Sequence, residues 1–145
     1  MKLSKLAAGV FALWPLCAQA SGDADTARRF GLIGVWALDC AQPATAYNPY
    51  ETFAIARDGT IVQSLDSLSI EASDHLHGLS LAGDKLSVKW DSATSKTTLD
   101  IVLRKDNGKL QSWSSARPDG TVIVRDGKSV HTGNPMPLFG KCPKR

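Results

Sequence analysis

Apolar and polar residues alternate along most of this chain with the period of a β-strand. Leu86, Val88 and Trp90 are separated by single polar residues, and apolar residues recur at every second position between residues 99 and 103. A period of two places apolar side chains on one face of a strand and polar side chains on the other. After residue 32, no apolar spacing typical of a helix persists for more than one turn. The pattern therefore predicts an all-β protein.

Short groups of turn-forming residues separate the alternating stretches. Asp58-Gly59, His77-Gly78 and Gly83-Asp84 are three of these groups, and Gly, Asn and Asp tolerate the positive φ that tight hairpins require. Because the connections are short, consecutive strands are expected to pair antiparallel. We predict about eight strands from this pattern, at residues 32–38, 51–57, 60–66, 68–76, 79–90, 97–104, 109–116 and 121–126.

Two stretches depart from the simple alternation. A short helical turn is predicted before the first strand, with Asp23 or Asp25 as its N-cap and Gly31 at its end. Later in the chain, Trp113 is out of phase with Leu110. That strand is therefore expected either to carry a bulge or to show a tryptophan on its outer face.

The strand pattern favours a closed sheet. An open meander would expose two unpaired edges, whereas closure into a barrel pairs them. The expected fold is an antiparallel up-and-down barrel of about eight strands, wide enough inside for side chains or one small ligand. The Pro-rich segment 133–140 is expected to form neither strand nor helix and to run back across the barrel.

The first twenty residues have the composition of an export signal. Lys2 and Lys5 precede the apolar run 6–14, and the stretch closes on Ala18-Gln19-Ala20, a small-x-small cleavage pattern. The apolar run is too short to span a bilayer. We therefore predict a signal peptide at residues 1–20, a single domain at 21–145, no membrane span after cleavage, and a periplasmic or secreted location.

The charge balance excludes nucleic acid as a partner. The net charge is only +3 at pH 7, and it falls further once Lys2 and Lys5 leave with the signal. A nucleic-acid binder needs a dense field of Lys and Arg, whereas both signs are interspersed along this chain.

Cysteine usage points to one disulfide. Cys17 is removed with the signal, which leaves Cys40 and Cys142. An even pair in an exported chain predicts a disulfide between them, and a loop of about 100 residues closed this way stabilises a fold by roughly 4 to 5 kcal/mol. A redox-active or metal-binding thiol pair would need a local Cys-x-x-Cys or a nearby His, and neither is present.

A short motif carries a resemblance to a known family. Gly34-Val35-Trp36, placed after the helical turn and at the start of the first strand, resembles the Gly-x-Trp signature of lipocalins and their calycin relatives. The resemblance implies that Trp36 closes one end of the barrel and that a basic residue of the last strand, Arg125, packs over its ring. The length of the chain is closer to short calycins such as avidins or bacterial periplasmic protease inhibitors.

The aromatic residues around the first long loop suggest a ligand site. Tyr47, Tyr50 and Phe53 lie in or after the Pro-rich stretch 42–49, where a lipocalin-like barrel would carry the lid over its mouth. With Trp90 on the wall, they would suit a small amphipathic ligand. Alternatively, the tyrosines plug the barrel end. An interior of roughly 300 Å³ or more would favour the ligand, and a filled core would favour a protein partner.

Other candidate chemistry is weaker. His75 and His77 share one strand face, and His131 could complete a three-histidine site for zinc or copper; the strand parity instead points His75 and His77 to solvent. No Gly-x-Ser-x-Gly elbow is present. Three carboxylates could face each other across a cleft, as in a glycoside hydrolase. We interpret them instead as exposed side chains of strands: Glu51, Asp66 and Glu71.

These observations predict a non-enzymatic barrel without a cofactor that binds a small apolar or amphipathic molecule. The alternative is a protein-interaction factor in the envelope, such as a hydrolase or protease inhibitor or an effector. It would use the N-terminal arm, the 42–49 loop or the Pro-rich tail. A third hypothesis is metal capture by the three histidines.

Overall fold

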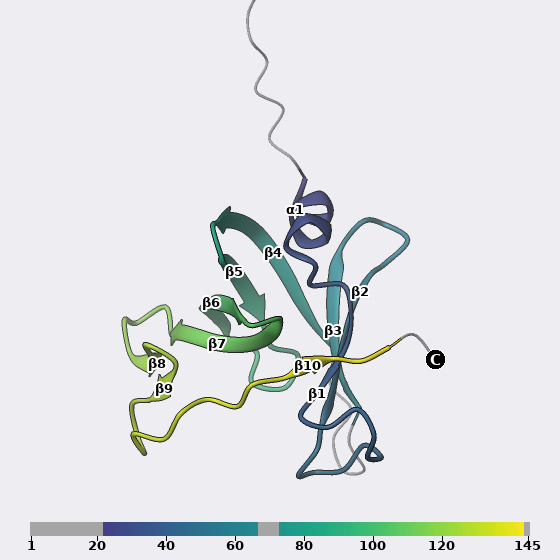
Figure 1. Ribbon diagram of the computed structural model, residues 1–145. Helices are drawn as coiled ribbons and strands as arrows, with labels where there is room; N and C mark the ends of the chain where they lie inside the picture. Colours follow the sequence, from purple (N-terminus) through teal and green to yellow (C-terminus); the bar gives the residue numbers. More distant parts are fainter. Residues whose placement is uncertain (1–21, 67–72, 144–145) are drawn as a thin grey trace, which may run out of the picture.

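The computed structural model describes residues 22–66 and 73–143 as one helix followed by a single curled antiparallel sheet (Figure 1). The predicted signal peptide lies outside the described residues. Ten strands are present in the described part, in the spatial order β10-β1-β2-β3-β4-β5-β6-β7-β8-β9. The elements are α1 (Asp23–Phe30), β1 (Gly34–Ala37), β2 (Tyr50–Ile55), β3 (Ile61–Asp66), β4 (Ser73–Ala82), β5 (Lys85–Asp91), β6 (Thr98–Asp106), β7 (Lys109–Ala116), β8 (Val122–Arg125), β9 (Lys128–Ser129) and β10 (Gly140–Lys141).

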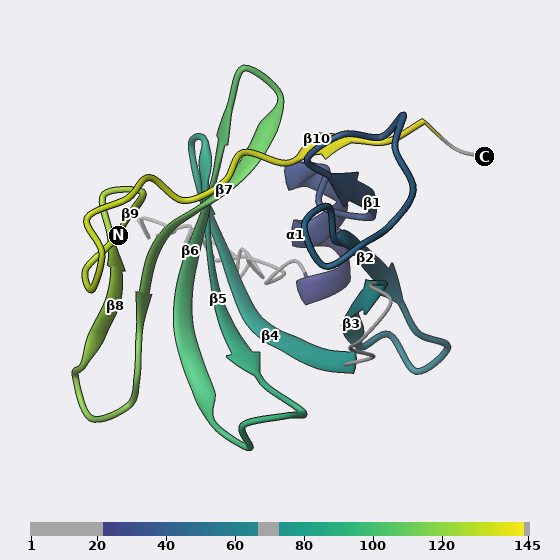
Figure 2. The same cartoon turned by 90° about the horizontal axis from the view of Figure 1, so that it is seen from below.

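The sheet curls into a half-barrel, and the C-terminal segment spans its open side. Figure 2 shows this segment crossing from β9, past β7, to the edge of β1. Phe139 exchanges two backbone hydrogen bonds with Leu110 of β7, at 2.8 and 2.9 Å, and β10 pairs with β1. We call residues 135–142 the C-terminal strap. The predicted return of the Pro-rich tail is confirmed, but the sheet is a half-barrel and not the closed barrel that was expected, because the described edge strands β9 and β10 do not pair with each other.

The predicted disulfide is confirmed and fixes the end of the strap. Cys40 and Cys142 are bonded, with their Cα atoms 5.4 Å apart. The backbone N–H of Cys142 also donates to the carbonyl of Val35 at 2.8 Å. The first and the last strand of the described fold therefore lie side by side.

The prediction of eight strands was wrong, because two strands of two residues each were missed. β9 follows a tight turn after β8, and β10 lies within the tail that was expected to contain no strand. Both are too short to show an alternation of two. They form because neighbouring strands offer unpaired backbone groups at the sheet edge.

The boundary predicted between residues 76 and 79 was also wrong. His77-Gly78 is not a turn: β4 continues through it to Ala82, with a register shift against β5 between His77 and Ser80. The turn lies at Gly83-Asp84, which divides the predicted strand 79–90. The first part of the predicted strand 68–76 lies outside the described residues.

The helix was predicted in the right place but with the wrong N-cap. Gly22 is the N-cap, and Gly31 ends the helix in the left-handed conformation, at φ 74°. Asp23 lies inside the first turn, where its carboxylate accepts hydrogen bonds from the backbone N–H groups of Gly78 and Leu79, at 2.7 and 2.9 Å. This contact docks the helix on the bulge of β4.

The core lies between the helix and the inner face of the sheet. Ala27 and Phe30 of α1 pack against apolar side chains of the strands, and the helix covers one end of the half-barrel (Figure 2). The largest fully buried side chains are Trp36, Phe53, Leu32, Ile61 and Leu86. No helix in the described part of the chain combines the length and the apolar character that crossing a bilayer requires.

Candidate functional site

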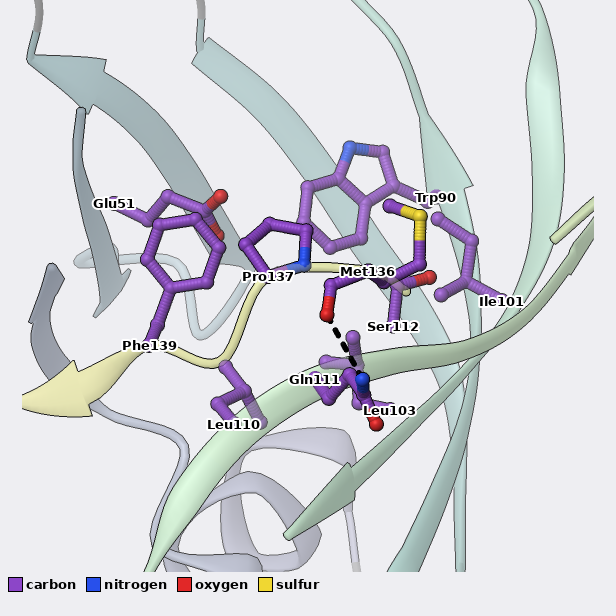
Figure 3. A pocket seen from close by; sticks show the side chains of 10 residues that line it. All are labelled: Glu51, Trp90, Ile101, Leu103, Leu110, Gln111, Ser112, Met136, Pro137 and Phe139. Atoms are coloured by element: carbon purple, nitrogen blue, oxygen red, sulfur yellow. Dashed lines mark hydrogen bonds between the residues drawn. The ribbon is translucent and has the colours of Figure 1, made fainter. Parts of the chain in front are cut away.

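A cavity of about 190 Å³ lies between the inner face of the sheet and the C-terminal strap. Figure 3 shows its lining side chains, most of which are apolar. The volume is smaller than the roughly 300 Å³ set as the mark of a ligand-binding interior. The lining residues are Glu51, Trp90, Ile101, Leu103, Leu110, Gln111, Ser112, Met136, Pro137 and Phe139.

The apolar wall follows from the alternation seen in the sequence. Val88 pairs with Ile101 and Leu86 with Leu103 across β5 and β6. Side chains on directly paired residues share one face of the sheet. Because Leu86 is fully buried in the core, this whole row, with Trp90 at its end, points inward.

A bulge at Trp113 decides which serine of β7 reaches the cavity. Val102 pairs with Ser114 and Leu103 with Ser112, so Trp113 has no partner in β6. The extra residue reverses the alternation: Ser112 lines the cavity, and Ser114 lines a separate groove. The bulge was one of the two alternatives that the sequence left open.

The strap covers the cavity and is bonded to β7. The Gln111 side-chain amide donates to the backbone carbonyl of Met136 at 2.9 Å, the dashed line in Figure 3. Phe139 pairs with Leu110 through the backbone as described above. The strap thereby places Met136, Pro137 and Phe139 over the apolar wall.

Glu51 is the charged residue of the lining. It pairs with Trp36 of β1 and Leu65 of β3, on the same face of β2 as the buried Phe53. No hydrogen bond or ion pair joins the Glu51 side chain to any residue that the structure describes. Burial raises the pKa of Glu51 to about 7, because removal from water disfavours the charged form.

Trp90 is held in a fixed orientation at the same end of the barrel. Its indole N–H donates to Asp74 at 2.7 Å, and its ring meets Phe53 edge-on at 5.8 Å. The other oxygen of Asp74 accepts the backbone N–H of Ala93 at 2.7 Å. Asp74 is thus a second carboxylate near the cavity, with both oxygens already bonded.

The four aromatic residues predicted to bind a ligand do not form one site. Trp90 lines the cavity, and Phe53 packs against it from the core. Tyr50 faces away: its hydroxyl donates to the carbonyl of Gln42 at 2.6 Å and lies 3.1 Å from that of Cys40. Tyr47 is 92% exposed. The cavity lining contains no residue of the 42–49 loop, so the strap, and not this loop, covers the cavity.

The loop after β1 has a fixed shape of its own. The side-chain amide of Asn48 donates to the carbonyls of Asp39 and Pro43, at 3.0 and 3.2 Å. Its oxygen accepts the backbone N–H of Asp39 at 3.0 Å. Together with the Tyr50 hydroxyl, these bonds hold the loop while leaving Tyr47 at its surface.

The cation expected over Trp36 comes from a different residue. Trp36 is buried at the end of the barrel nearest the helix, and its indole N–H donates to Leu32 at 2.7 Å. Lys141 of β10 places its ammonium 5.4 Å from the ring centre. Arg125, the predicted partner, is exposed on β8 and pairs with Lys128 of β9. The strap supplies the cation because β10, and not β8, lies beside β1.

The three histidines do not form one metal site. His75 and His77 are exposed on β4, and His77 lies 3.1 Å from Asp91. His131 is exposed beyond β9, at an edge of the sheet, whereas β4 lies in its interior. Among residues 22–66 and 73–143, no group of three or more His, Cys, Asp or Glu residues could hold a metal ion.

The interpretation of Glu51 as an exposed carboxylate was wrong. Asp66 is exposed and pairs with Tyr50, so it lies on the opposite face from Glu51, and Glu71 lies outside the described residues. The signal for Glu51 was present in the sequence: it precedes Phe53 by two positions, and the period of two points both side chains inward.

Comparison with known proteins finds no family model, curated protein or solved structure that matches this chain.

Proposed function

We propose that this chain is a non-enzymatic, lipocalin-like β-barrel protein that binds one small amphipathic molecule under its C-terminal strap. The observation that carries the proposal is the cavity of about 190 Å³, which is lined mostly by apolar side chains and holds one carboxyl group without a partner among the described residues. Apolar pockets with a small number of placed polar groups are the usual form of small-molecule sites.

The volume restricts the size of the ligand. Drug-sized molecules occupy sites of roughly 300 Å³ or more, whereas a cavity of about 150 Å³ accepts benzene. The present cavity fits between these limits. The ligand is therefore a single ring or a short chain with one polar group, and a lipid or a large cofactor is too big.

The lining supports binding rather than catalysis. Ser112 and Glu51 both border the cavity, but no hydrogen bond joins them among the described contacts. The described lining contains no His, Lys, Arg or Cys to activate a nucleophile or stabilise an oxyanion.

The proposal includes export to the periplasm or the exterior. The Cys40–Cys142 disulfide supports it, because such bonds persist in oxidising compartments. The burial of Trp36 at one end of the sheet, beneath the ammonium of Lys141, supports the lipocalin-like architecture.

Filling the cavity tests the proposal. Met1 and Met136 are the two methionines of the chain, so a ¹³C-methyl methionine label gives a resonance that reports the cavity directly. We expect benzene and xenon to shift the Met136 resonance in the wild type. Ser112→Leu should abolish the shift by filling the space.

Ser114→Leu is the matched control, because Ser114 lies on the same strand but lines the other groove. It should leave the benzene and xenon shifts intact. If neither probe moves the Met136 resonance of the wild type, or if Ser112→Leu binds them equally well, the proposed function is wrong.

A second candidate is a protein-interaction factor that uses the 42–49 loop. Tyr47 is 92% exposed on a loop that Asn48 holds in shape, and a pre-ordered exposed tyrosine is a common anchor of protein interfaces. Native mass spectrometry of the protein purified from its host should then show a stoichiometric partner that Tyr47→Ala loses. A ligand-free monomer in both samples would exclude this candidate.

A further inference from the structure

We infer that the cavity selects a small organic cation: an ammonium group on a compact apolar body, with the ammonium paired to the Glu51 carboxylate. This inference rests on the proposed function and names the chemical class of its ligand. Three features of the cavity support it: an unpartnered acid, the absence of a competing base in the described lining, and aromatic rings beside the acid.

Glu51 provides the first feature. The Glu51 carboxyl is half-buried in an apolar wall, where its contact with water is reduced, and no described side chain or backbone group forms a hydrogen bond with it. Buried charges in proteins are normally paired. The partner missing from the chain is therefore a hydrogen-bond donor that enters from outside, and a charged donor forms the stronger bond.

The charges around the cavity provide the second feature. The described lining holds no basic side chain. Lys141 pairs with Trp36, which also pairs with Glu51. Its ammonium donates to the carbonyl of Gly31 at 2.9 Å, lies over the Trp36 ring and is not part of the lining. Asp74 adds a second negative charge behind Trp90. An anion entering this site would meet the Glu51 carboxylate and no cation in the described lining, so the local charge favours a positive ligand.

The rings provide the third feature. Trp90 and Phe139 border the same space as the Glu51 carboxyl (Figure 3). The faces of aromatic rings attract cations, and sites that recognise ammonium ligands use them for this purpose. An alcohol could also donate to Glu51, but it would gain neither the charge pairing nor the attraction to the rings.

A proton competes with the cation for Glu51. Burial raises the pKa of this carboxyl to about 7, so at acidic pH the site is neutral and loses its preference. The neighbours facing Glu51 from β1 and β3, Trp36 and Leu65, do not titrate. The inner face also carries charged groups on other strands: Asp74 of β4, Lys105 of β6, whose ammonium lies over Phe30, and Lys141 of β10, whose ammonium lies over Trp36. Affinity for an ammonium ligand should therefore rise as the pH passes through about 7.

Three isosteres separate the alternatives. Benzylamine, benzyl alcohol and benzoate share one body and differ in charge, and each can be titrated into the full chain at about pH 8. Calorimetry and the Met136 methyl resonance report binding. We expect benzylamine to bind about tenfold or more tightly than benzyl alcohol, and benzoate not to bind.

Glu51→Gln tests the residue itself. Gln copies the shape of the protonated acid, so the variant should fold. The variant should bind benzylamine about tenfold or more weakly than the wild type does. Its affinity for benzyl alcohol should change by less than about twofold. Asp66→Asn is the matched control, because Asp66 lies on the other face of the sheet. It should change neither affinity.

The outcomes keep the two proposals apart. If benzyl alcohol or benzoate binds the wild type as tightly as benzylamine, or if Glu51→Gln leaves benzylamine binding unchanged, the cation inference is overturned and the proposed function stands. If none of the isosteres binds, and benzene and xenon also fail, the proposed function is overturned and the inference with it.

Discussion

The carboxylate of Asp23 accepts a hydrogen bond from the backbone N–H of Gly78, at 2.7 Å and across 55 residues of sequence. The same carboxylate accepts the N–H of Leu79 at 2.9 Å. These two N–H groups lie in the bulge of β4, where the ladder to β5 shifts register. The Asp23 side chain thus provides the hydrogen-bond acceptor for the backbone N–H groups at the place where the pairing of β4 and β5 is irregular.

Asp23→Ala should lower the free energy of unfolding by about 1 to 3 kcal/mol, because it removes two hydrogen bonds from backbone N–H groups to a charged carboxylate. Asp25→Ala is the control: Asp25 is an acid of the same helical turn, and its bond is to the exposed Arg28. Urea denaturation should show a change of about 0.5 kcal/mol or less for the control. Equal losses in both variants would mean that the Asp23 contact contributes only as a helix-terminal charge.

Stability should fall as the pH rises from about 4.5 to about 7, because of Glu51. The pKa of this group is raised from 4.5 to about 7 in the fold, so over this range the folded chain keeps a proton that the unfolded chain has lost. Below this range Glu51 is protonated in both the folded and the unfolded chain, so no stability is lost. Above it the loss is complete, about 3 kcal/mol at roughly 1.4 kcal/mol per pH unit.

Glu51→Gln should remove this dependence. The variant and the wild type should have similar free energies of unfolding at about pH 4, and the variant should be more stable by about 3 kcal/mol at about pH 8. Other groups titrate equally in both proteins, so the difference between them isolates Glu51. A difference that stays constant between the two pH values would contradict the raised pKa.

Lys141→Met should destabilise the protein, whereas Arg125→Met should not. Lys141 lies over the ring of Trp36 and donates to Gly31, and a cation over an indole contributes about 0.5 to 2 kcal/mol. Arg125 is exposed on β8, where a substitution changes stability by about 0.5 kcal/mol or less. Thermal unfolding of the two variants measures the contrast, and the reverse order would restore Arg125 as the partner of Trp36.

Loss of the disulfide should cost about 4 to 5 kcal/mol, because the bond between Cys40 and Cys142 spans 102 residues and restricts the unfolded chain. The double variant Cys40→Ser and Cys142→Ser should show this loss in urea denaturation. It should also broaden the Met136 methyl resonance, since the strap then keeps its hydrogen bonds to β1 and β7 but loses its covalent anchor. Cys17→Ser is the control and should change neither measurement.

The alternation of apolar and polar residues was sufficient to predict most of the sheet. Where strands pair without a register shift, as β2 and β3 do, the predicted and observed limits differ by two residues at most. The prediction failed at Gly78, since a glycine that usually marks a turn lies here within a bulged strand. The acceptor that makes the bulge favourable is on a distant helix, which no local pattern contains.

The candidate site was also predicted only in part, because local spacing indicates some of its residues and distant contacts decide the others. The period of two was enough to point Glu51, Trp90 and Ile101 inward, although Glu51 was interpreted as exposed from its charge. The prediction that the 42–49 loop covers the site was wrong. The strap covers it instead, because Phe139 finds unpaired backbone groups on Leu110 and the disulfide holds its far end.

By itself, the sequence determined the class of the fold, the disulfide and the inner face of each regular strand, because these depend on local spacing and on an even pair of cysteines. Only the tertiary structure decided what covers the cavity, which cation lies over Trp36 and what Glu51 lacks. Each of these depends on groups distant in sequence coming close together, and on whether a buried polar group finds a partner once they have.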